Sequence, residues 1–183
     1  MSYPTHAFAV YQATPRYTSP FDRILRFPWT RRKVGYYAVN AVPFAAACAN
    51  LPQLPPSGIN IKPGKEDGMF TFQVPVVPLR LPDAETFPYI LEYVYYAYEW
   101  MTHRRFMPPN ICGFREDTGA IIPQDELINT LVGNAELSTL WRNARDIFGF
   151  HQNLVSLGIS DEGVWNMLDY TWGALRTAIL ELS

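Results

Sequence analysis

The chain has 183 residues and a net charge of -2 at pH 7, a size at which one domain can bury an adequate core without disulfides or a structural metal. Charged residues make up only 17% and aromatic residues 15%, so much of the aromatic surplus must lie in a core or at an interface. No stretch approaches the roughly 18 apolar residues that cross a bilayer, and the N-terminus lacks a signal-peptide pattern. The composition therefore excludes a membrane-spanning protein and indicates an intracellular one, nuclear or cytoplasmic.

The first 33 residues form a basic segment rich in Tyr, Phe and Pro. Residues 1–33 hold six basic residues and one acidic residue, a net charge of +5, whereas residues 34–183 have a net charge of -7. No stable hydrophobic period is present, so we expect an extended or loop-like arm with its aromatic side chains packed on the rest of the chain. Docking of this arm on the acidic remainder, or a solvated tail, is favoured over the alternative of nucleic-acid binding. Residues 34–183 are expected to form a single domain.

The next elements are short and interrupted by proline. A strand is predicted over residues 33–39, and an Ala-rich helical turn begins at Pro43. Residues 52–68 are predicted to be a loop with a brief strand over residues 59–62. Residues 69–81 are apolar and favour β-structure, but two prolines in this segment remove backbone donors. We therefore predict an edge strand, or a strand that ends at Pro75.

The clearest pattern in the sequence is that of a long helix after Asp83. The apolar residues of its predicted buried face recur every three or four positions, at Phe87, Leu91, Val94, Tyr98 and Met101. The predicted outer face holds Glu92, Tyr96, Glu99 and Arg104. Because Tyr95, Tyr96 and Tyr98 cannot all face one core, at least one of them must be exposed or covered by another segment.

Helical patterns dominate the C-terminal third of the chain. Helices are predicted over residues 124–132, 137–150 and 160–182, with breaks near Gly133 and Gly158. Ser160 is predicted to cap the last helix. Its apolar stripe consists of Trp165, Leu168, Trp172, Leu175 and Ile179, so both tryptophans are expected in the core.

Catalytic motifs are absent from the sequence. None of the three histidines has a second metal-type ligand at helical spacing, and His103 is interpreted as part of the basic end of a helix. No phosphate-binding loop or nucleophile elbow is present. Cys48 and Cys112 lack metal-site spacing and are interpreted as buried free thiols. The acids of residues 116–126 lack the spacing of a calcium loop. We therefore predict no enzyme activity, no catalytic residue, no cofactor and no metal.

Two motifs resemble those of known families. Residues 69–106 resemble the middle of a BTB/POZ-type domain, in which a strand is followed by the pattern formed here by Asp83, Phe87, Leu91, Tyr93 and Tyr95. The C-terminal region is similar to the ending of the fungal clampless proteins at Leu140, Trp141, Asn143, Leu157, Gly158, Asp161, Trp165 and Trp172. The resemblance spans about residues 34–182. It implies an α+β, helix-dominated BTB/POZ-like domain with a small sheet and a C-terminal helical extension.

The resemblance also implies a function. Clampless proteins are regulators of mating-dependent development in basidiomycete fungi, without known enzymatic activity. We therefore expect a protein-protein interaction module that forms a homodimer or binds a regulatory partner, with contacts through Arg31, Arg32, Tyr96, Trp100 and Arg104. Two alternatives stay open: a nucleic-acid-binding regulator that uses residues 16–33, and a small-molecule binder whose aromatic residues line a pocket.

Overall fold

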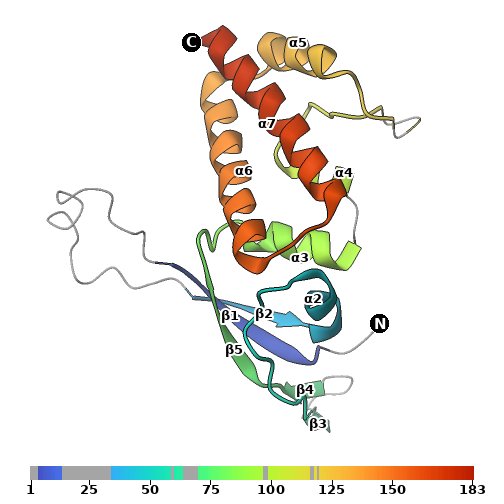
Figure 1. Ribbon diagram of the computed structural model, residues 1–183, viewed down its shortest axis with the longest axis vertical. Helices are drawn as coiled ribbons and strands as arrows, with labels where there is room; N and C mark the ends of the chain where they lie inside the picture. Colours follow the sequence, from blue (N-terminus) through green and yellow to red (C-terminus); the bar gives the residue numbers. More distant parts are fainter. Residues whose placement is uncertain are drawn as a thin grey trace, which may run out of the picture. The chain divides into compact units, whose positions relative to one another are not determined.

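The chain divides into two compact units, Met1–Ala84 and Glu85–Ser183. A computed structural model describes residues 4–13, 34–58, 60–63, 70–96, 99–115, 118 and 120–183. The first unit contains the strands and one short helix, and the second is helical (Figure 1). The structure thus confirms the predicted helix-dominated α+β class. The predicted division into an arm of residues 1–33 and one domain of residues 34–183 stays a prediction.

The first unit is built on a three-stranded sheet in the order β2-β1-β5. Strand β1 (His6–Gln12) is central; it pairs antiparallel with β2 (Val34–Val39) and parallel with β5 (Val76–Leu81). Alternate residues of β1, namely His6, Phe8 and Val10, are buried, as expected for a strand with one face on a core. Helix α2 (Ala41–Ala47) contributes Phe44, whose ring packs edge-on against Phe8 at a centroid distance of 5.1 Å.

Strand β1 corrects the prediction of an irregular arm. Its buried positions include the polar His6, and its outward positions include Ala7 and Ala9, so the polarity does not alternate even though the burial does. The buried imidazole is satisfied locally, since Nε2 bonds to the Pro55 carbonyl oxygen at 2.9 Å and Nδ1 contacts Thr5 Oγ1 at 3.0 Å. Residues 14–33, which include all six basic side chains of this arm, lie outside the described residues.

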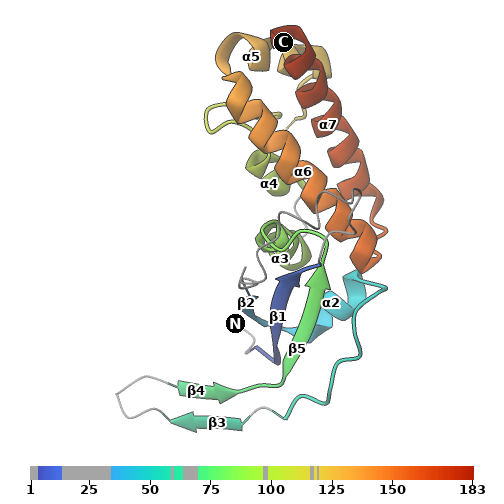
Figure 2. The same cartoon turned by 90° about the vertical axis from the view of Figure 1, so that its left-hand side faces the viewer.

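The other β-strand predictions are largely confirmed. The strand predicted over residues 33–39 is β2, and the brief strand predicted over residues 59–62 is β3 (Asn60–Pro63), which pairs antiparallel with β4 (Phe70–Gln73) (Figure 2). The proline-rich segment after β4 continues as β5, an edge strand that accommodates Pro78. Helix α2 begins two residues before Pro43, because the Asn40 side chain accepts a hydrogen bond from the Val42 amide.

The second unit begins with α3 (Phe87–Tyr96) and α4 (Glu99–Arg105), where one long helix was predicted; residues 97 and 98 lie outside the described residues. The buried residues of α3 are Phe87, Ile90 and Tyr93. The predicted face was therefore rotated by about one position, since Leu91 and Val94 are only half-buried. The expected exposure within the tyrosine run is confirmed, because Tyr95 and Tyr96 are both exposed.

Three further helices complete this unit: α5 (Gln124–Asn134), α6 (Leu137–Leu157) and α7 (Glu162–Leu182). Helices α6 and α7 run antiparallel side by side in both views (Figures 1 and 2). Helix α6 extends beyond the predicted end at residue 150 and stops at Gly158, which adopts the left-handed conformation with a φ of 68°. Within the described residues, no helix is long and apolar enough to span a membrane.

Candidate functional site: the cleft between α6 and α7

The turn between α6 and α7 fixes the relative position of the two helices. Asp161, rather than the predicted Ser160, caps α7; its carboxylate accepts hydrogen bonds from the amides of Gly163 at 2.7 Å and Val164 at 3.4 Å. A hydrogen bond from the Tyr93 hydroxyl and these amide bonds lower the pKa of Asp161. The indole of Trp165 donates to the Ile159 carbonyl oxygen at 3.0 Å, which ties the turn to the first part of α7.

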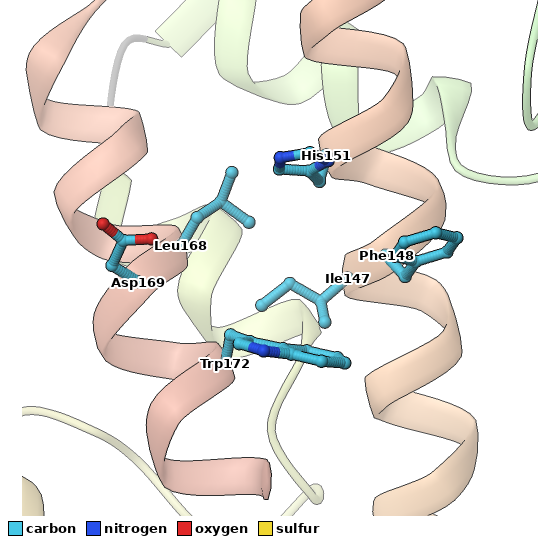
Figure 3. A pocket seen from close by; sticks show the side chains of 6 residues that line it. All are labelled: Ile147, Phe148, His151, Leu168, Asp169 and Trp172. Atoms are coloured by element: carbon cyan, nitrogen blue, oxygen red, sulfur yellow. The ribbon is translucent and has the colours of Figure 1, made fainter.

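A cleft of about 270 Å³ lies between the two helices. Figure 3 shows Ile147 of α6 and Leu168 of α7 pointing toward each other, with His151 and Trp172 at opposite ends. Phe148 lies on the outer side of α6, and Asp169 extends from α7. The lining is therefore aliphatic and aromatic, with one carboxylate and one imidazole at its borders.

Large apolar side chains remain exposed around this cleft. Trp172 is 42% exposed and Phe148 is 53% exposed, and Trp141 and Val155 of α6 are also exposed. The predicted core position of Trp172 is therefore wrong, while Trp165 is half-buried and packs edge-on against His151 at a centroid distance of 5.4 Å. Exposed aromatic residues that cluster on one face are characteristic of interaction surfaces.

The core of the second unit holds a buried histidine, which the sequence pattern indicated only as part of the basic end of a helix. His103 is 4% exposed, and its Nδ1 lies 2.7 Å from Thr171 Oγ1. Because the Thr171 hydroxyl donates to the Met167 carbonyl oxygen at 2.6 Å, its oxygen must accept from a protonated Nδ1. Burial lowers the pKa of His103 to about 4. The imidazole is therefore neutral at pH 7.

The other nitrogen of this imidazole faces backbone. Nε2 of His103 has no hydrogen-bond partner among the described residues, and a Cβ atom on Gly113 would collide with it. Gly113 thus packs directly against Nε2 of His103. Among the described residues, no group of three or more His, Cys, Asp or Glu side chains could hold a metal ion.

Both cysteines are free, as predicted. Cys48 is buried, and desolvation raises its pKa to about 11, so the thiolate that a nucleophile requires is not populated at pH 7. Cys112 is half-buried rather than buried.

The structure does not gather the predicted contact residues at this cleft. Tyr96 of α3 is exposed and Arg104 of α4 is exposed, whereas Arg31, Arg32 and the side chain of Trp100 lie outside the described residues. Their role in partner binding stays a prediction. The exposed residues Trp141, Phe148 and Val155 were missed by the sequence reasoning, although their spacing of seven residues could have shown that they share one face of α6.

Comparison with known proteins gave two matches at the level of protein families. Residues 1–82 match the family model described as Clampless protein 1 N-terminal domain, and residues 104–183 match the model described as Clampless protein 1 C-terminal domain. The cleft between α6 and α7 lies entirely within the second match. No curated protein and no solved structure matches the chain.

Proposed function

Because the chain belongs to the clampless protein family, whose name fits a role in the development of fungal clamp cells, we propose that it acts in this process as a non-enzymatic protein-protein interaction module. The observation that supports this proposal is the surface beside the α6–α7 cleft, on which large apolar side chains are exposed. We call it the α6–α7 face and define it by the exposed Trp141, Phe148, Val155, Asp169 and Trp172 and the half-buried Trp165. Burying such side chains against a partner is favourable, since aromatic anchors contribute strongly to binding.

The buried ionisable groups support a non-catalytic function. His103 and Cys48 are both held in their neutral forms by burial, and neither lies at the cleft. A general base or nucleophile needs access to substrate and a pKa suited to its task. The surface of this cleft is better suited to side chains of another protein, because its volume of about 270 Å³ is slightly below that of typical ligand pockets, which are roughly 300–1,000 Å³.

This proposal includes three further hypotheses: that the fold is BTB/POZ-like, that the protein forms a homodimer, and that it regulates mating. The resemblance at Asp83, Phe87 and Tyr93 supports the first of them. The alternative of nucleic-acid binding depends on residues 16–33, all of which lie outside the described residues.

Complementation tests the proposal directly. In a clamp-forming fungal strain that lacks its own clampless gene, the wild-type protein is expected to restore clamp cells, and Phe148→Asp is expected not to. Ile121→Asp is the matched control, since Ile121 is 72% exposed in the same unit but does not line the cleft. Equal protein levels and equal melting temperatures would show that both variants fold. Full restoration of clamp cells by Phe148→Asp would reject the α6–α7 face as the functional surface.

A further inference from the structure

The α6–α7 face contains regular rows of side chains. Trp141, Phe148 and Val155 follow one another at intervals of seven residues along α6, and Trp165 and Trp172 do so along α7. Two turns of an α-helix contain about 7.2 residues, so residues seven apart lie on one side of the helix. A groove with apolar rows at this interval fits a helix with a heptad pattern of its own.

A charged row borders the same groove on α7. Glu162, Asp169 and Arg176 are exposed and again lie seven residues apart. Phe148 and Asp169 line one cleft, and the helices are antiparallel, so the row on α6 and the charged row on α7 run level with each other. Each row extends over 14 residues, or about 21 Å, which corresponds to about four turns of a docked helix.

The charges of these rows and of the whole unit favour a basic occupant. Glu162 and Asp169 supply two carboxylates along the α7 side of the groove, Arg176 adds one positive charge at the far end of the row, and Trp172 lines the same cleft as Asp169. A Lys or Arg side chain opposite Asp169 can therefore pair with the carboxylate and contact the indole face. Residues 85–183 contain thirteen acidic and six basic residues, a net charge of -7, which attracts a cationic partner over longer distances.

We propose that the α6–α7 face binds an amphipathic helix of a partner protein, with large apolar side chains at heptad spacing and basic residues along the flank that faces Glu162 and Asp169. This inference rests on the proposed function and adds the chemistry of the partner. A second copy of the chain fits less well, because its residues 85–183 would bring a second net charge of -7 to the same interface.

Two designed peptides test the proposal with the full-length protein. Both are about 21 residues long and carry leucine at heptad positions a and d; one has lysine at the flanking positions e and g, and the other has glutamate there. Fluorescence anisotropy of labelled peptide gives the Kd at physiological salt. We expect the lysine peptide to bind wild-type protein at least about tenfold more tightly than the glutamate peptide.

Variants show whether this binding occurs at the proposed face. Phe148→Asp is expected to weaken binding of the lysine peptide by at least about tenfold, whereas Ile121→Asp leaves the Kd unchanged. Asp169→Arg is expected to remove or invert the preference for lysine, because it reverses the charge in the middle of the α7 row. Equal binding to Phe148→Asp, or an unchanged preference with Asp169→Arg, would overturn the proposal.

Sedimentation equilibrium tests the remaining alternative, in which a second copy of the chain occupies the α6–α7 face. A wild-type dimer that becomes a monomer with Phe148→Asp would assign the face to a second copy and overturn the helix proposal, while a monomer in both cases is the expected result. The complementation experiment is independent of these measurements. Loss of clamp cells with Phe148→Asp, together with no discrimination between the peptides, would leave the proposed function standing and reject only the basic helix.

Discussion

His103 shows how one buried side chain can shape both stability and the interpretation of function. Its Nδ1 donates to Thr171, its Nε2 faces Gly113, and its ring lies 5.7 Å from that of Tyr170. Tyr170 itself is anchored by a hydrogen bond from its hydroxyl to the Ile122 carbonyl oxygen at 2.8 Å. These contacts connect α4, α7 and the segment between α4 and α5. The histidine therefore belongs to the core that supports α7.

The lowered pKa of His103 predicts a loss of stability in mild acid. The folded-state pKa is about 4 and the ordinary value is 6.5, so below pH 6.5 the unfolded chain binds a proton that the folded chain excludes. The free energy of unfolding is expected to fall as the pH decreases from 6.5 to 4, by up to about 3 kcal/mol. Urea titrations at each pH give this free energy of unfolding. Tryptophan fluorescence is a suitable probe, because four of the five tryptophans lie in residues 85–183, the unit that contains His103.

His103→Gln provides the comparison for this pH dependence. Glutamine can donate to Thr171 but does not titrate, so the variant is expected to be less stable at pH 7 and to show a flatter profile between pH 6.5 and 4. Below about pH 4 both proteins should lose stability, since the lowered pKa of Asp161 adds a contribution that disappears as that carboxylate is protonated. Identical dependence of the free energy of unfolding on pH in the two proteins between pH 6.5 and 4 would contradict the assignment of this pH dependence to His103.

Two glycines provide a matched test of packing at His103. Gly113→Ala is expected to destabilise the protein by about 1–3 kcal/mol, because the added methyl group collides with the imidazole. Gly133→Ala, in exposed α5 with open space around it, is expected to stabilise by up to about 1 kcal/mol. In a His103→Ala background the cost of Gly113→Ala should shrink. An equal cost in both backgrounds would mean that the collision is not with His103.

Single residues were harder to predict from the sequence than helices. The pattern of basic residues around His103 correctly indicated the end of a helix, but it could not show that Thr171, 68 residues away, provides a buried acceptor. Trp172 was assigned to the core because it continues an apolar stripe, yet the adjacent Thr171 is buried and the indole is exposed. Hydrophobic periodicity alone does not tell a core stripe from an interaction surface.

At the scale of elements, the cap of α7 should control the stability of the second unit. Asp161→Ala removes the acceptor for the Gly163 and Val164 amides and the partner of the Tyr93 hydroxyl. The free energy of unfolding, measured by urea titration, is expected to fall by about 0.5–2 kcal/mol. Asp169→Ala is the matched control on the same helix and should change the free energy of unfolding by less than about 0.5 kcal/mol. Equal losses of stability in Asp161→Ala and Asp169→Ala would argue against a stabilising role of Asp161 as the cap of α7.

The sequence predicted elements well where local chemistry determines them. The three C-terminal helices were found because their apolar residues recur at helical spacing and Gly158 ends α6. Strand β1 was missed because its pairing with β2 and β5 is not local: β1 and β5 are separated by more than sixty residues. Helices α3 and α4 end and begin at Tyr96 and Glu99, and residues 97 and 98 lie outside the described residues.

At the scale of the whole molecule, charge and family membership agree with the division into two units. Residues 1–84 have a net charge of +5 and residues 85–183 a net charge of -7, and the two family matches fall on residues 1–82 and 104–183. The resemblance of the C-terminal region to clampless proteins was visible in the sequence and is confirmed at the family level. The open α6–α7 face could not be predicted, since it depends on how two helices pack.

The central claim is that another protein occupies the α6–α7 face while clamp cells develop. The most direct measurement places a photo-crosslinking amino acid at position 148, with position 121 as the control, and irradiates living clamp-forming cells that express the full chain. We predict an adduct at position 148 but not at 121, with the cross-linked peptide of the partner coming from an amphipathic, Lys- or Arg-rich segment. No adduct at position 148, or the same adducts at both positions, would contradict the account.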